Sequence, residues 1–131
     1  MASLFTKIIQ GEIPAHKIAE NENFFAFLDV FPLVKGHTLI IPKLEIDYLF
    51  DIEDVLFQQL FLFAKQIAIP LKQAIPCKKI GITVIGLEVP HAHIHLIPMQ
   101  TMSDMDFNKT KKRAEDAELA TIAQEIRKFI F

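Results

Sequence analysis

The sequence predicts an α+β fold, in which helices pack on an antiparallel sheet of five short strands. Short segments rich in β-branched and aromatic residues lie on both sides of one long segment with helical periodicity. Strand-forming segments that are not alternated regularly with helices favour an antiparallel sheet over a parallel one. No linker or change of composition divides the 131 residues, so we expect one domain spanning residues 1–131.

The first third of the chain predicts a short helix followed by three strands. Residues 3–11 form the helix, with Ser3 as its N-cap and Gly11, which tolerates a positive φ, as its stop. Turn-forming residues then separate three β-rich segments. These predicted strands cover residues 16–20, 24–30 and 38–41.

The rest of the chain predicts a long helix, two strands and a C-terminal helix. Apolar residues recur at helical spacing over residues 52–69, and Pro70 is expected to end or kink that helix. Strands are predicted at 80–85 and 91–98. A polar loop over 100–108 then precedes a helix over 111–131.

Composition excludes several classes of protein. No uncharged apolar stretch reaches the ~18 residues that a membrane span needs, although the apolar fraction is 51%. The single cysteine, Cys77, excludes an internal disulfide and a multi-cysteine metal site. A net charge of −2 without a basic block argues against a nucleic-acid partner. With no secretory signal pattern at the start, we expect a cytoplasmic protein.

The most informative motif is a run of alternating histidines, His91, His93 and His95. Side chains alternate between the two faces of a strand, so all three imidazoles are expected on one face. Neighbouring imidazoles disfavour each other's charged forms, so at least one should be neutral near pH 7. Three interpretations are open from spacing alone: an incidental polar face, a metal site, or nucleophilic and acid–base catalysis.

The motif and three further segments resemble the histidine triad (HIT) superfamily, in its branch of small nucleoside phosphoramidate hydrolases. The further segments are the opening helix with its Gly-Glu-Ile-Pro turn, a Phe-rich strand ending in Asp, and a Gly-His-Thr-Leu-Ile-Ile-Pro-Lys strand. They occur in the family's order and cover about residues 3–107. The matching segments are 4–15, 24–29, 36–43 and 91–99.

The resemblance implies an enzyme that works through a nucleotidyl-histidine intermediate. His93 matches the nucleophile that attacks the α-phosphorus of a nucleoside 5′-phosphate derivative, and His95 matches the residue that contacts phosphate and helps the leaving group. His91 and His37 match histidines that hold the nucleophile in its reactive tautomer. The substrate class is then a purine nucleoside phosphoramidate or a related compound, cleaved with release of the nucleoside monophosphate and without a metal or other cofactor.

The nucleotide-binding residues follow from the same resemblance. Asp29 matches the residue that accepts hydrogen bonds from both ribose hydroxyls. Apolar residues match the walls of the nucleobase slot, and the segment before the triad matches the one whose backbone N–H groups face the phosphate. The wall residues are Leu4, Phe5, Ile8 and Phe27, and the phosphate-facing residues include Gly86, Glu88 and Val89.

The sequence departs from the family in three places. Many relatives bind zinc through two cysteines and a histidine at the positions of Ser3, Thr6 and Glu45, so no structural zinc is expected here. Leu87 replaces a Gln whose contact is lost, and Glu88 would repel phosphate or attract a cationic leaving group. The connection between the last two strands is also shorter and lacks an Asn.

Two alternatives remain beside the phosphoramidate hydrolase. A dinucleoside polyphosphate hydrolase or nucleotidyl transferase would use the same nucleophile, and a nucleotide-binding sensor would have little turnover. The chain is also expected to form a homodimer, because its apolar excess, with twelve Phe, fits burial against a second copy. The family resemblance implies the same assembly, and the alternative is a Phe-rich core.

Overall fold

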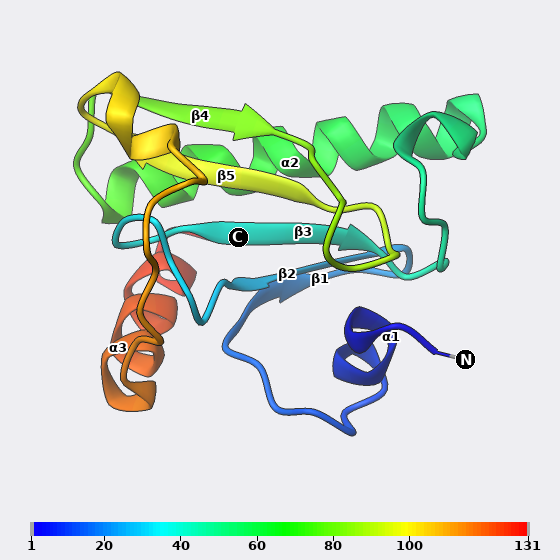
Figure 1. The fold of residues 1–131 in the computed structure, drawn as a ribbon, viewed down its shortest axis with the longest axis horizontal. Coiled ribbons are helices and arrows are strands. Elements are labelled where there is room, and N and C mark those ends of the chain that lie inside the picture. Colours follow the sequence, from blue (N-terminus) through cyan, green and yellow to red (C-terminus); the bar gives the residue numbers. More distant parts are fainter. Residues whose placement is uncertain (1, 131) are drawn as a thin grey trace.

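The computed structural model describes residues 2–130 and confirms the predicted α+β fold. Five antiparallel strands form one sheet in the order β1-β2-β3-β5-β4 (Figure 1). The strands are β1 (Lys17–Glu20), β2 (Phe24–Leu28), β3 (Thr38–Pro42), β4 (Lys79–Thr83) and β5 (Ile94–Met99).

Three α-helices accompany the sheet. They are α1 (Leu4–Ile9), α2 (Asp54–Ala74) and α3 (Asp116–Arg127), with two 3₁₀ turns, η1 (Leu49–Asp51) and η2 (Met102–Met105), in the connections. Ser3 caps α1 as predicted, because its side-chain oxygen accepts a hydrogen bond from the Thr6 amide at 3.0 Å. Gly11 adopts the predicted positive φ of 81° after that helix.

Pro70 was expected to end or kink the long helix, and it does not end it. The helix continues through Pro70 to Ala74. Pro70 is buried and Leu71 is completely covered, so the last turn packs on the core of the protein. Tertiary packing therefore outweighs the hydrogen bond that a proline removes from a helix.

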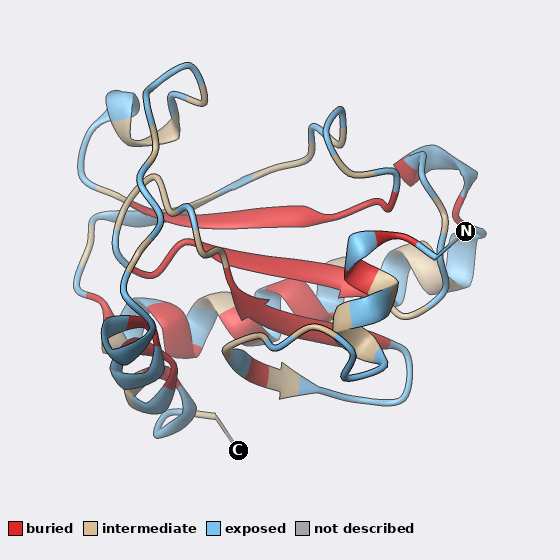
Figure 2. Cartoon of the chain, turned by 60° about the horizontal axis from the view of Figure 1, so that its bottom comes forward, coloured by how far each residue is buried: buried red, intermediate tan, exposed pale blue. Residues whose placement is uncertain are grey.

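The sheet has two different covered faces, set by the alternation of side chains along each strand. On one face, Ala26, Ile40 and Ile94 belong to the main core with α2 and α3. On the other face, Phe27 and Leu39 pack with Phe5 of α1 in a second, smaller cluster. The central strands are consequently buried along their whole length (Figure 2).

Several predicted elements are shorter in the structure, among them the last strand and the C-terminal helix. The last strand begins at Ile94 rather than residue 91, because the backbone amides of His91 and Ala92 donate to Val89 and Ile46 instead of to the sheet. The C-terminal helix begins at Asp116 rather than 111, since the preceding segment is extended and bound through the Ala114 amide to the Val30 carbonyl at 2.8 Å. Residue 131 lies outside the described residues.

Within residues 2–130, no helix combines the length and the apolar character that crossing a lipid bilayer requires.

Candidate active site

The histidines of the predicted triad lie together on the α1 face of the sheet. All three are buried, and the ring centres of His93 and His95 are 4.9 Å apart. Phe5 of α1 packs edge-on against His93, with ring centres 4.9 Å apart, and also against His91 at 5.8 Å. The single face predicted from alternation is therefore observed, although His91 and His93 precede the strand itself.

Hydrogen bonds fix the tautomer of His93. Its Nδ1 lies 2.8 Å from the carbonyl oxygen of His91, which only accepts, so Nδ1 carries the proton. In a neutral ring Nε2 is then unprotonated, with a free lone pair. Burial lowers the pKa of His93, which favours this neutral form.

A second chain of bonds fixes the tautomer of His95. The Leu33 amide donates to Nδ1 of His37 at 3.0 Å, so the proton of neutral His37 is on Nε2. This Nε2–H donates to Nδ1 of His95 at 2.9 Å. The proton of His95 is therefore on its Nε2, which makes that atom a hydrogen-bond donor.

The unprotonated nitrogen of His93 and the protonated one of His95 are both open to a ligand. Neither Nε2 has a hydrogen-bond partner among residues 2–130. No side-chain nitrogen or oxygen of those residues is both fully buried and without a partner. The site thus presents one nucleophilic nitrogen beside one proton donor, which is the pair that nucleophilic catalysis needs.

Burial keeps the imidazoles of the cluster uncharged. It lowers the pKa of both His37 and His95 to about 3, and the positive charge of Lys111 acts in the same direction. The pKa of His91 is also lowered, again chiefly by burial. Burial raises the pKa of Asp29 at the edge of the cluster. The tautomers deduced above are therefore those of neutral rings at neutral pH.

His91 is held by a network at the start of α1. Its Nε2–H donates to the Pro42 carbonyl at 2.7 Å, so Nδ1 accepts, from the Ser3 hydroxyl at 2.8 Å. The Ser3 amide and the Thr6 hydroxyl each donate to one Glu45 oxygen at 2.6 Å. These bonds lower the pKa of Glu45 to about 2, so it is a carboxylate.

The other predicted site residues lie around the cluster. Asp29 has a carboxylate oxygen 3.7 Å from Nε2 of His37. Phe5, Phe27 and Ile8 share the small apolar cluster, with Val89 packed against it, while Leu4 is 47% exposed. Gly86 has a positive φ of 72°, and exposed Glu88 is near enough for its charge to act on Asp29 and His93. The structure thus gathers the predicted residues at one end of one face.

Two residues at this site were missed by the sequence reasoning. The ring of Phe107 lies 4.9 Å from that of His95 and 6.1 Å from that of His37, and Lys111 lies over Phe107. Both come from the segment predicted as a polar loop and the start of a helix. The signal that was available is Phe107, the one aromatic residue of the segment 100–108.

Among residues 2–130, one group has ligand atoms close enough for a metal ion. The candidate atoms of Asp29, His37 and His95 all lie within 4.8 Å of one another. A metal bound between the two histidines would replace their mutual hydrogen bond at 2.9 Å. Without a metal, the Leu33 amide donates to His37 and His37 donates to His95, so each nitrogen between them is paired in neutral rings.

The fold and the cluster of buried histidines can be compared with those of known proteins, and this comparison identifies the family. The sequence model of the HIT domain matches residues 10–102. The chain therefore belongs to the HIT domain family.

Individual relatives agree with this assignment. The chain is 35% identical over 131 residues to an uncharacterized HIT-like protein of Mycoplasma genitalium, covering 92% of each chain. It is 39% identical over 98 residues to the adenosine 5′-monophosphoramidase HNT1 of Saccharomyces cerevisiae, covering 74% of this chain and 62% of the yeast protein. A crystal structure of a HIT-like protein from Bartonella henselae superimposes with a TM-score of 0.86, at 27% identity, over 98% of this chain and 96% of that one.

Proposed function

We propose that the protein is a nucleotide hydrolase or transferase that cleaves purine nucleoside phosphoramidates through a nucleotidyl-His93 intermediate. The observation that carries the proposal is the pair of open nitrogens, unprotonated Nε2 of His93 and protonated Nε2 of His95. A yeast relative named as an adenosine 5′-monophosphoramidase supports the substrate class.

In the first step, Nε2 of His93 attacks the α-phosphorus and forms a phosphorus–nitrogen bond. The bond to the leaving amine breaks, and Nε2–H of His95 gives the amine nitrogen its proton. His95 is then deprotonated, and its negative charge is balanced by the positively charged imidazolium of nucleotidyl-His93. In the second step, water attacks the phosphorus and gives a proton back to His95. The bond to His93 breaks, the nucleoside monophosphate leaves, and both imidazoles return to their starting forms.

The surrounding residues have proposed roles in holding the nucleotide. Asp29 accepts hydrogen bonds from the ribose hydroxyls, and the backbone of Gly86–Val89 faces the phosphate, with Glu88 toward a cationic leaving group. His37 and His91 position the other two imidazoles. The nucleobase binds against Leu4, Phe5, Ile8 and Phe27, the apolar residues beside the cluster.

A turnover assay tests this proposal. Purified protein is mixed with adenosine 5′-phosphoramidate in the presence of EDTA, and released AMP is measured. Wild-type protein is expected to release AMP and His93→Ala is expected to be inactive, whereas His16→Ala, which removes a histidine outside the cluster, keeps its activity. AMP release by His93→Ala would contradict the mechanism. So would a wild-type activity that is present without EDTA and absent with it.

The same assay separates the two alternatives. Cleavage of diadenosine polyphosphates in preference to the phosphoramidate would favour a dinucleoside polyphosphate hydrolase or a transferase. Binding of AMP without turnover of either substrate would favour a sensor. The Glu88 carboxylate near the cluster favours the phosphoramidate, since it disfavours a polyphosphate leaving group.

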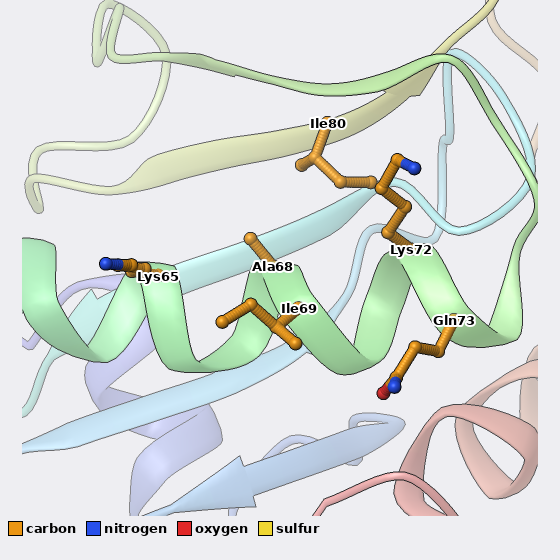
Figure 3. Close-up of a pocket in the computed structure, with 6 residues that line it drawn as sticks. All are labelled: Lys65, Ala68, Ile69, Lys72, Gln73 and Ile80. Carbon is orange, nitrogen blue, oxygen red and sulfur yellow. The ribbon is translucent and has the colours of Figure 1, made fainter.

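We also propose that the protein is a homodimer joined along α2 and the edge strand β4. Val55, Leu62 and Ile69 recur every seven residues on α2 and are more than half exposed. A groove between α2 and β4 is lined by the apolar residues Ala68, Ile69 and Ile80, together with Lys65, Lys72 and Gln73 (Figure 3). Such an apolar stripe beside an open sheet edge is a surface that proteins usually cover.

Sedimentation velocity tests the dimer. Leu62→Glu places a charge in the stripe and is expected to give a monomer. Gln58→Glu, which adds the same charge at another exposed position of α2, is expected to remain a dimer. A monomeric wild-type protein would contradict the assembly. The cytoplasmic location remains a prediction from the sequence.

A further inference from the structure

The segment between η2 and α3 crosses the histidine face of the molecule. It runs from the end of β5 past the sheet to α3 (Figure 1). Phe107 in this segment has its ring 4.9 Å from that of His95 and 6.1 Å from that of His37, both edge-on. The segment therefore forms part of the wall around the proposed catalytic imidazoles.

This part of the wall is anchored at both ends. Before Phe107, the Thr101 and Gln100 amides donate to Asp104, which closes η2. After it, the Ala114 amide donates to the Val30 carbonyl at 2.8 Å, next to Asp29 in the sequence. Contacts within the same chain consequently hold both ends of the stretch that carries Phe107 and Lys111.

Lys111 is the cation that this anchored segment holds near the cluster. Its Nζ lies 5.6 Å from the centre of the Phe107 ring, within range of a cation–π interaction. It is half-buried, whereas Lys109 and Lys112 are exposed. Among residues 2–130, no carboxylate lies within ion-pair distance of Lys111.

Among the described residues, the groups around the cluster are neutral or negatively charged, apart from the ammonium group of Lys111. The four imidazoles are neutral, and the nearby carboxylates of Asp29 and Glu88 would repel an anion. The positive charge of Lys111 acts on His37, His95 and Asp29, and its partner Phe107 packs against His95, so this charge lies on the His95 side of the cluster. A phosphate at the open Nε2 atoms needs a cation to compensate these negative charges.

We propose that Lys111 binds the phosphate of the nucleotide and makes the site selective for nucleotides over nucleosides. The inference rests on the proposed function in one respect, that a nucleotide occupies the histidine cluster. Lys111 comes from the same chain as the histidines, so its own contact with the phosphate needs no second copy.

Binding of AMP and of adenosine, measured by calorimetry, tests the inference. Lys111→Met removes the charge and is expected to weaken AMP binding by about tenfold or more, the cost of losing one charged hydrogen bond, with adenosine binding unchanged. Lys111→Arg keeps the charge and is expected to retain most of the AMP affinity. Lys112→Met, at the exposed neighbouring position, is expected to change neither.

Three results would overturn the inference. They are unchanged AMP binding in Lys111→Met, equal weakening of AMP and adenosine in that variant, and absence of AMP binding by the wild-type protein. Failure of the proposed function gives a different result. If wild-type protein binds AMP through Lys111 but does not cleave the phosphoramidate, the proposed chemistry is wrong and the phosphate-binding role of Lys111 stands.

Discussion

Nε2 of His37 lies 2.9 Å from Nδ1 of His95, in a buried bond whose two rings both contact the ring of Phe107 edge-on. The direction of this bond is set from outside the pair, because the Leu33 amide donates to the other nitrogen of His37. A backbone amide in the loop before β3 thus determines which nitrogen of His95 carries its proton. In the proposed mechanism, that proton goes to the leaving group.

Replacing His37 is therefore expected to lower kcat more than it raises KM. His37→Ala leaves the tautomer of His95 unspecified and is expected to reduce kcat by about tenfold to a hundredfold, at the low end of the effect of general acid catalysis. His37→Gln keeps a donor toward His95 and is expected to recover part of the rate. Equal activities of the alanine and glutamine variants in steady-state kinetics would contradict the bond's proposed role.

Asp29 is expected to contribute to affinity through the ribose. Asp29→Asn should weaken binding of AMP by about tenfold, since a hydrogen bond to a charged acceptor is worth roughly 1.5–3 kcal/mol. With 2′,3′-dideoxy-AMP, which lacks both hydroxyls, the wild type and the variant should bind equally. A loss of the same size for both ligands would show that Asp29 acts elsewhere.

The buried histidines predict that the protein is destabilised by mild acid. The pKa values of His37 and His95 are about 3 in the folded protein, against an ordinary value of 6.5, so the unfolded chain binds more protons between these values. The free energy of unfolding should then fall as pH drops below about 6.5, by up to about 1.4 kcal/mol per pH unit for each histidine. Urea denaturation between pH 7.5 and 5 measures this slope.

The control for this slope is a variant with both histidines removed. His37→Asn combined with His95→Asn should unfold at lower urea but show a weaker dependence on pH. Carboxylates do not produce the effect in this range, because those with lowered pKa values, such as Glu45 at about 2, titrate at more acidic pH. A wild-type stability independent of pH between 7.5 and 5 would contradict the buried neutral pair.

The network at the start of α1 is expected to accept a zinc site by substitution. Ser3, Thr6 and Glu45 occupy the positions at which the family resemblance implies zinc ligands. Ser3 and Thr6 each donate to Glu45 at 2.6 Å, and the Ser3 hydroxyl lies 2.8 Å from His91. The variant Ser3→Cys, Thr6→Cys, Glu45→His should bind one zinc ion per chain with a Cys₂His₂ ligand set. Elemental analysis of folded variant and wild-type protein measures this, and a zinc-free folded variant would contradict the geometry.

The sequence predicted the order of the elements and the common face of the histidines because both follow from local patterns. Alternation over residues 91–95, which leads into β5, and helical periodicity in α2 depend only on neighbouring residues. The errors were at the ends of elements, where distant contacts decide. Pro70 stays helical because the turn around Leu71 is buried in the core, and the start of α3 shifts because Ala114 binds Val30.

In the candidate site, too, local patterns predicted some residues and distant contacts decided the others. The triad could be found from its spacing, whereas Phe107 and Lys111 reach His95 only through the path of the chain between η2 and α3. No pattern in the polar segment predicts that path. Likewise, Ser3 was predicted as a helix cap, and only the fold shows that its hydroxyl also binds His91 across 88 residues of sequence.

The central claim, a covalent nucleotidyl-His93 intermediate, is tested most directly by trapping it. Protein is mixed with adenosine 5′-phosphoramidate and quenched in alkali, where a phosphorus–nitrogen bond to histidine survives, and its peptides are analysed by mass spectrometry. We predict an adenylyl group on His93 and none on His91, His95 or His16. An adenylyl group on another residue, or AMP release with no adduct at any quench time, would contradict the account.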